Sequence, residues 1–230
     1  MDWTPKQNVN GISIQVCLNG YSFKVRDGGS VTESGWRGAE TVFTAPELQR
    51  AYDSVELSLH TPKVALVPLP FFKESEAAET LSGTAILDSG DEVGRIRIPE
   101  YAAELLYSLS VGEMLSRTIG GTVRLSSGEP VEVLPEMFYV LRDLDKVGDY
   151  NKIVVSWSPG CLHLAIAQGG NLLLANVFQA ADFTTAEYFL FLAVKKLQLN
   201  PEVSSVYFRT PLREEETMSL YRYFKSVERL

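Results

Sequence analysis

The sequence predicts a mixed α/β protein built from two tandem copies of one βββαβα unit, and three observations support this fold class. First, four landmarks recur in the same order about 140 positions apart. Second, both copies open with apolar strands joined by a tight turn. Third, both continue into a Thr-x-x-Glu helix start and end in an apolar strand followed by an acidic segment. The paired landmarks are residues 12–17 with 153–157, 19–20 with 159–160, 44–47 with 184–187, and 67–69 with 210–212.

The first copy opens with a β-hairpin. Two alternating apolar runs, 12–18 and 21–25, flank Asn19-Gly20. Asn-Gly favours a hairpin turn because both residues tolerate positive φ. A Gly- and Ser-rich stretch follows and leads to a third predicted strand near 41–43.

A helix is predicted to begin at Thr44. Pro46 fits the first turn, and Glu47 can reach back to the cap N–H. One apolar stripe supports the helix, and its members are Leu48, Tyr52, Val55 and Leu59. A nearly continuous apolar strand at 64–69 follows, and such a strand is typical of a sheet buried on both faces.

The second copy carries the same pattern. Glycine-containing turns join its three predicted strands, 153–158, 162–168 and 172–178, so they form an antiparallel meander. A helix capped by Thr184 through Glu187 comes next. Because it is apolar nearly all round, we expect it to lie between two layers.

The chain is predicted to close with one more strand and one more helix. The strand covers 205–209. The helix begins at Thr210-Pro211 and presents residues at helical spacing, namely Met218, Tyr221, Phe224 and Val227.

An α+β segment at about 87–145 separates the copies. Its predicted strands are 94–98, 103–109 and 122–125, and its predicted helices lie near 112–119 and 131–145. The polar stretch 145–151 marks the boundary, which gives a first domain at 1–148 and a second at 149–230.

Composition excludes several classes of function. The 230 residues are 45% hydrophobic and carry a formal net charge of −8, which disfavours binding to nucleic acid. The longest fully apolar run, 188–194, is too short to insert in a membrane, and the start shows no signal-peptide pattern, so we expect a cytoplasmic protein. Cys17 and Cys161 have no CxxC spacing and are interpreted as buried free thiols.

The order of these elements resembles the actin-like ATPase fold, in which each of two lobes is a ribonuclease H-like unit. The segment Tyr21-Ser-Phe-Lys-Val25 is similar to the second strand of bacterial pilus-assembly and cell-division members. The whole layout resembles a family of uncharacterised bacterial proteins with this fold. The resemblance implies two lobes around a cleft that in active relatives holds ATP with Mg²⁺.

The residues at the expected nucleotide positions depart from the pattern that the resemblance implies. Active relatives carry Asp-x-Gly between the first two strands of each lobe, where the acid holds magnesium through water. The matching turns here are Asn19-Gly20 and Ser158-Pro159-Gly160, which lack an acid, and Pro159 also lacks a backbone donor. The adenine-side glycines are replaced by an acidic stretch at 210–216. Asn19, Gly20, Ser158 and Gly160 are therefore candidate cofactor-binding residues only if the cleft binds a nucleotide.

Other candidate residues have ordinary structural interpretations. His163 alternates with leucines in a strand and is interpreted as partly exposed, and no histidine has metal-ligand spacing. Asp53 and Glu56 lack a strand partner for two-metal nuclease chemistry. The paired glycines favour turns over phosphate nests. The segment 67–72 could contact a partner or pack internally, and packing is favoured.

Two functions follow from the sequence. The first is a non-catalytic actin-like scaffold that binds a protein partner, with no catalytic residues, metal or cofactor. The alternative is a nucleotide-binding switch or a weak ATPase or kinase-like enzyme that uses ATP and Mg²⁺ in the cleft. The missing acids favour the scaffold, whereas a glycine retained in both turns supports the alternative.

Overall fold

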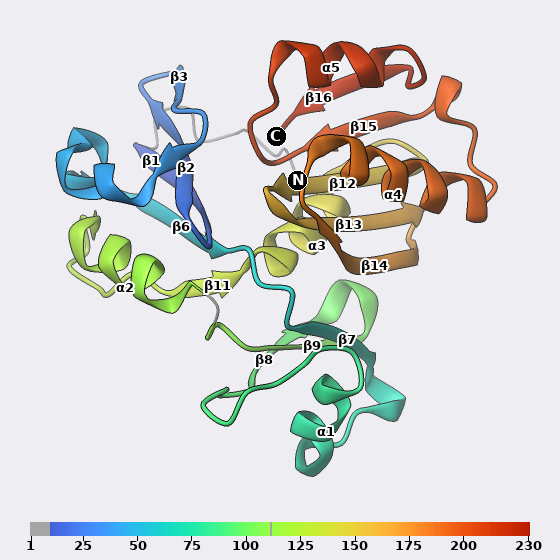
Figure 1. Cartoon of the computed structure of the whole chain (residues 1–230), viewed down its shortest axis with the longest axis horizontal. Coiled ribbons are helices and arrows are strands. Elements are labelled where there is room, and N and C mark those ends of the chain that lie inside the picture. The colour runs from blue at the N-terminus through green and yellow to red at the C-terminus, as the bar shows by residue number, and fades with distance from the viewer. Residues whose placement is uncertain (1–9, 111) are drawn as a thin grey trace, which may run out of the picture. The chain divides into compact units, whose positions relative to one another are not determined.

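The computed structural model describes residues 10–110 and 112–230, which form two compact units (Figure 1). The first unit comprises Met1–Leu59 and Gly112–Leu134, and the second comprises His60–Val111 and Pro135–Leu230.

This division differs from the predicted domains, 1–148 and 149–230. The reason is a shared apolar core, in which residues 60–111 and a helix near 136–146 pack with the C-terminal sheet. The mixed α/β class is confirmed in both units.

A six-stranded sheet forms the first unit, with the order β11-β6-β1-β2-β3 and β4 paired to β2. Its strands are β1 (Gly11–Cys17), β2 (Gly20–Asp27), β3 (Ser30–Glu33), β4 (Arg37–Gly38), β6 (Ser54–Leu59) and β11 (Val133–Pro135). β1 pairs antiparallel with β2 across the predicted Asn19-Gly20 turn and parallel with β6. A two-stranded sheet, β5 (Ala51–Tyr52) with β10 (Arg124–Leu125), and α2 (Glu113–Thr122) complete the unit.

The helix predicted from Thr44 is wrong. Thr44 ends the 3₁₀ helix η1 (Ala39–Thr44), which also replaces the strand predicted at 41–43, and a second 3₁₀ helix, η2 (Pro46–Gln49), follows. Of the residues expected to form the helical stripe, Leu48 lies in η2, Tyr52 in β5, and Val55 and Leu59 in β6. Val55, Leu57 and Leu59 alternate with polar residues, and this period of two matches the parallel pairing of β6 with β1.

The second unit contains a five-stranded sheet with the order β14-β13-β12-β15-β16. Its strands are β12 (Asn151–Ser158), β13 (Gly160–Gln168), β14 (Asn171–Ala180), β15 (Ser205–Phe208) and β16 (Ser226–Arg229). The predicted antiparallel meander is confirmed as β12-β13-β14, and the predicted 205–209 strand returns as β15, parallel to β12.

Three helices accompany this sheet: α3 (Glu136–Lys146), α4 (Phe183–Lys196) and α5 (Glu214–Tyr221). One apolar core joins the sheet to α4 and α5, and another joins it to α3, so helices cover both of its faces (Figure 1).

Three sequence expectations about these helices are wrong. Asp182, and not Thr184, caps α4, because its side chain accepts the Thr185 N–H. α4 is not enclosed on all sides, since Tyr188 is exposed. The last helix ends at Tyr221, and Val227 lies in the unpredicted strand β16, because pairing with Val206 of β15 extends the sheet there.

A separate antiparallel sheet, with the order β7-β9-β8, belongs to the second unit. Its strands are β7 (Val64–Pro68), β8 (Gly94–Ile98) and β9 (Ala103–Tyr107), and α1 (Ala77–Ser82) packs beside them. The expected pairing of Pro68 with Pro211 across the repeat is therefore wrong, because β6 occupies the place in the first sheet that β15 has in the second. Gly20 and Gly160 do match, since each begins the second strand of its sheet.

Within the described residues, no helix is long and apolar enough to cross a bilayer.

Candidate functional site

The Asn19-Gly20 turn lies in the first unit, and the packing around it explains the glycine at position 20. Gly20 pairs with Gly38 of β4, and a Cβ atom at position 20 would collide with the carbonyl oxygen of Arg37. The close approach of β4 therefore explains why position 20 is a glycine, and no bound ligand is needed to account for it. Asn19 is exposed at the tip of the turn.

Ser158 and Gly160 lie at the equivalent turn of the second unit. Ser158 is fully buried, and its Oγ has no hydrogen-bond partner among the described residues. Gly160 has φ +107° and open space beside its Cα, so its backbone is accessible. The four predicted residues are thus divided between the two units, two in each.

These turns do not fit the magnesium–nucleotide group of active relatives. Neither offers a carboxylate, the Ser158 hydroxyl is enclosed, and Pro159 cannot donate a backbone hydrogen bond. Among the residues that the structure describes, no group of three or more His, Cys, Asp and Glu side chains is placed to hold a metal ion.

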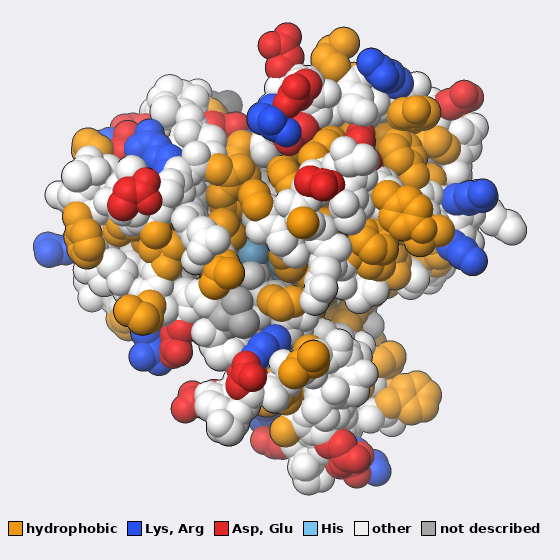
Figure 2. Space-filling view, viewed as in Figure 1, with side chains coloured by type: hydrophobic (Ala, Val, Ile, Leu, Met, Phe, Trp, Pro, Cys, Tyr) orange, Lys and Arg blue, Asp and Glu red, His pale blue; other side chains and the backbone are white. Residues whose placement is uncertain are grey.

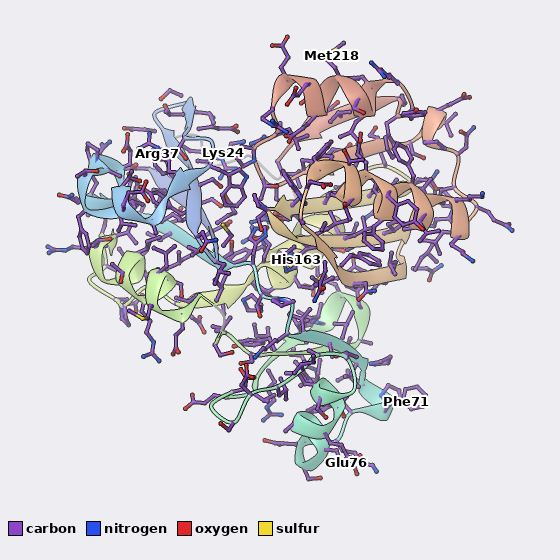
Figure 3. All side chains as sticks on the ribbon, viewed as in Figure 1. Lys24, Arg37, Phe71, Glu76, His163 and Met218 are labelled. Carbon is purple, nitrogen blue, oxygen red and sulfur yellow. The ribbon has the colours of Figure 1, made fainter. Side chains whose placement is uncertain are left out.

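A buried polar cluster lies between the five-stranded sheet and α3, and Figure 3 labels one of its members, His163. The interpretation of His163 as partly exposed is wrong, because its side chain is fully buried. Its Nε2 lies 3.1 Å from the carbonyl oxygen of Thr61, and its ring is 5.0 Å from that of His60. His60 Nε2 in turn lies 3.3 Å from Ser156 Oγ.

Burial controls the protonation of both histidines. It lowers the pKa of His60 to about 3 and that of His163 to about 4, although the nearby Glu136 carboxylate opposes the change. Both rings are therefore neutral at neutral pH. Ser156 and His60 are residue types that can serve as a nucleophile and its general base, but both side chains are buried beyond the reach of a substrate. The pair is structural.

An ion-pair cluster adjoins the histidines at α3. Arg209, which follows β15, donates from Nε to Glu136 Oε1 at 2.8 Å and from Nη1 to Asp143 Oδ2. Its guanidinium also lies over the Tyr139 ring, 5.2 Å from the centroid. Because Arg209 and Glu136 are almost wholly enclosed, this cluster links α3 to the sheet and is not placed to receive a ligand.

A second ion-pair cluster fixes a loop beside the small sheet. Lys63 Nζ contacts Asp91 Oδ2 at 2.6 Å and Asp88 Oδ2 at 2.9 Å, and the Ser108 hydroxyl donates to Asp91 Oδ1 at 2.7 Å. The Lys63 hydrogen bond holds the pKa of Asp91 far below its usual range. The hydrogen-bonding groups of Lys63 and Asp91 are used internally, so this cluster is also structural.

The segment 67–72 has a mixed environment. Phe72 packs against the core of the small sheet, as the favoured interpretation expects. Phe71, which Figure 3 labels, is 77% exposed. Phe71 is thus available for contact, but it stands alone among exposed prolines and polar residues.

The most distinctive feature of the second unit is a cavity of about 190 Å³ bounded by two edge strands. β7 is an edge strand of the three-stranded sheet, and β14 is an edge strand of the five-stranded sheet. Figure 1 shows β7 beside β14, and Figure 2 shows the surface hollowed between the two parts of this unit. The lining residues are Pro62, Val64, Ala65, Leu66, Thr84, Leu105, Met137, Ala175, Asn176 and Val177.

Sequence reasoning missed this cavity, because its walls are more than 100 residues apart along the chain. One signal was available: β14 contains no charged residue and no proline over its 10 residues. Edge strands usually carry such features to prevent pairing with another chain.

Comparisons with known proteins agree on the fold. Residues 13–227 match the model of a family described as "Protein of unknown function (DUF3822)". A Bacteroides thetaiotaomicron protein with actin-like ATPase fold and unknown function aligns with a TM-score of 0.64 and 16% identity, over 100% of this chain and 94% of that one. The PilM–PilN type IV pilus biogenesis complex aligns with a TM-score of 0.50 and 13% identity, over 97% and 88%. No functionally curated protein matches the sequence. The actin-like fold and the distant similarity to a pilus-assembly protein are thus confirmed.

Proposed function

The chain belongs to the family of proteins of unknown function DUF3822, and we propose that it is a non-catalytic actin-like scaffold that binds a protein partner. The observation that carries this proposal is the cavity between β7 and β14. Its walls combine apolar side chains with two strand edges, a combination suited to a polypeptide.

The size of the cavity supports a polypeptide over a small molecule. Sites for drug-sized ligands have volumes of roughly 300–1,000 Å³. At about 190 Å³ this cavity is smaller, and it suits one or two anchoring side chains of a longer chain that continues along the surface.

A fold neighbour supports the same class of function. The solved structure that contains PilM is described as a complex with PilN. Because the identity is only 13%, this likeness concerns the fold, and it supports partner binding as a use of this fold without indicating which partner.

The alternative, a nucleotide-binding switch, is supported by the accessible backbone at Gly160. It would have to work without an acid in either turn, so charge neutralisation of phosphates would depend on backbone amides alone.

The experiment that separates the two functions is a calorimetric and thermal-shift titration of the full chain with ATP, ADP and GTP, each with and without Mg²⁺. We expect no saturable response at millimolar nucleotide. A true site would give about 2.7 kcal/mol of stabilisation at 100 times its dissociation constant. A saturable, Mg²⁺-dependent shift would contradict the scaffold proposal and favour the switch.

A further inference from the structure

We infer that Cys161 is a modification site, at which hydrogen peroxide oxidises the thiol to a sulfenic acid with His163 as the base. The inference goes beyond the proposed function and does not depend on the cavity. Cys161, His163 and the other residues that form the site all belong to the second unit.

The first support is the register of the β12–β13 hairpin. Ser158 pairs with Cys161, the second residue of β13. Ser156 pairs in the same way with His163, two positions further along. Because side chains alternate between the faces of a strand, all four share the face that carries Ala165 into the core with α3. The hairpin therefore places a thiol, an imidazole and two hydroxyls side by side near its turn.

The second support is the hydrogen bonding of His163, which Figure 3 labels. Its Nε2 lies 3.1 Å from the carbonyl oxygen of Thr61. A carbonyl oxygen only accepts, so Nε2 carries the ring proton and Nδ1 keeps a free lone pair. Cys161 Sγ lies 3.7 Å from Nδ1 and 4.0 Å from Nε2, so the thiol can donate to Nδ1. A nucleophile, its base and a group that orients the base are thus in contact.

The surroundings of His163 favour transient proton uptake. Burial lowers its pKa to about 4, so the ring is neutral at neutral pH and can accept the thiol proton. The nearby Glu136 carboxylate opposes this shift and stabilises the imidazolium while it holds the proton. The ring of His60, 5.0 Å away, is also neutral and does not repel it.

The third support is the Ser158 hydroxyl, which stands directly opposite the thiol. Ser158 is fully buried, and its Oγ has no hydrogen-bond partner within the described part of the chain. An enclosed hydroxyl without a partner costs free energy. A small polar molecule at the thiol supplies the missing hydrogen bond, and hydrogen peroxide offers one oxygen to Ser158 and the other to Sγ.

The approach to the thiol selects for a small reagent. Cys161 is 7% exposed, whereas Ser156 is wholly enclosed. Gly160, next to Cys161, has φ +107° and open space beside its Cα. We therefore expect hydrogen peroxide to reach the sulfur from the turn, and bulky aromatic disulfide reagents to be excluded.

The reaction is balanced with peroxide as the oxidant. The thiol proton moves to His163 Nδ1, and the thiolate sulfur attacks one oxygen of hydrogen peroxide. An S–O bond forms while the O–O bond breaks, and the leaving hydroxide takes the proton from Nδ1 to become water. The sulfur is oxidised by two electrons, the peroxide is reduced, and the product is the sulfenic acid of Cys161.

The other cysteine of the chain, Cys17, is an internal control. It is 8% exposed, nearly the same as Cys161, and burial raises the pKa of its thiol. If burial alone decided reactivity, both thiols would be inert. The site around Cys161 predicts that only this thiol reacts.

The test treats the full chain with hydrogen peroxide and traps sulfenic acid with dimedone, and peptide mass spectrometry assigns the adduct. We expect labelling of Cys161 to be about tenfold or more faster than labelling of Cys17 in the folded chain. It should also be faster than labelling of Cys161 in the urea-unfolded chain. The second comparison is decisive, because a thiol that is merely buried reacts more slowly when the chain is folded.

Two variants test the roles of the neighbouring side chains. His163→Gln can keep the hydrogen bond to Thr61 but lacks the base, and should slow labelling about tenfold or more. Ser158→Ala should slow it several-fold, and carries the comparison if circular dichroism shows that His163→Gln is unfolded. Tyr188→Ala, on the exposed side of α4 and so on the other face of the sheet, is the matched control that should change nothing.

The outcomes are separate from those of the nucleotide titration. No adduct on Cys161, equal labelling of both cysteines, or slower labelling of Cys161 in the folded than in the unfolded chain overturns the inference. An unchanged rate in folded His163→Gln overturns the role of the base and with it the site. Each of these results leaves the scaffold proposal standing, and a Mg²⁺-dependent nucleotide response would contradict the scaffold and leave the thiol site standing.

Discussion

At the scale of single residues, the buried histidines make the stability of the second unit depend on pH. The folded state holds His60 and His163 neutral because burial lowers their pKa values from 6.5 to about 3 and about 4. The unfolded chain binds protons on both below about pH 6.5. The contribution of the histidines to stability is therefore complete above pH 6.5 and is lost as the pH falls towards 4 and then 3.

We predict that the free energy of unfolding falls on the order of 1 kcal/mol per histidine for each pH unit below about 6. Urea denaturation at pH 7.5, 6 and 5 measures this slope. His163→Gln should reduce the slope, whatever its effect on stability at pH 7.5. An unchanged slope in that variant would show that other groups cause the pH dependence.

The Arg209 cluster gives a second prediction at this scale. Arg209→Met leaves the Glu136 and Asp143 carboxylates buried without their cation, and removing one partner of a buried pair costs about 3–5 kcal/mol. Urea denaturation of the purified variant measures the loss. Adding Glu136→Gln to Arg209→Met should recover part of the stability, and strictly additive losses would contradict the coupling of the two side chains.

At the scale of elements, α4 is fixed to its sheet by one buried face. Leu190 is 1% exposed and belongs to the core that joins α4 to the five-stranded sheet. We predict that Leu190→Ala lowers the free energy of unfolding by about 2–5 kcal/mol. Tyr188→Ala, two positions away on the exposed face, should cost much less. Equal losses would show that α4 is anchored by both faces.

The elements also show what the sequence could predict. The strands joined by tight turns, such as those around Asn19-Gly20, were predicted because turn chemistry is local. The strands of the 44–59 segment were not predicted, because the spacing of Val55 and Leu59 fits both a helix and an alternating strand. Pairing with β1, which the local sequence does not contain, decides between them.

At the scale of the whole molecule, the repeated order of strands was predictable because the same pattern of apolar strands and glycine turns occurs twice in the sequence. Each large sheet places its first strand antiparallel to the second and parallel to a later one. The cavity was not predictable, because it depends on β7 and β14 meeting in space. β14 contains no charged residue, but only the structure shows that β7 faces its edge.

The measurement that tests the central claim most directly is photo-crosslinking in the native cells from a photoreactive amino acid at Gln179. This exposed residue lies on the β14 edge, two positions beyond the cavity wall. The account predicts a covalent adduct with a second protein from this position and none from the same amino acid at Tyr188, on the exposed side of α4. No adduct, or equal adducts from both positions, would contradict partner binding beside the cavity.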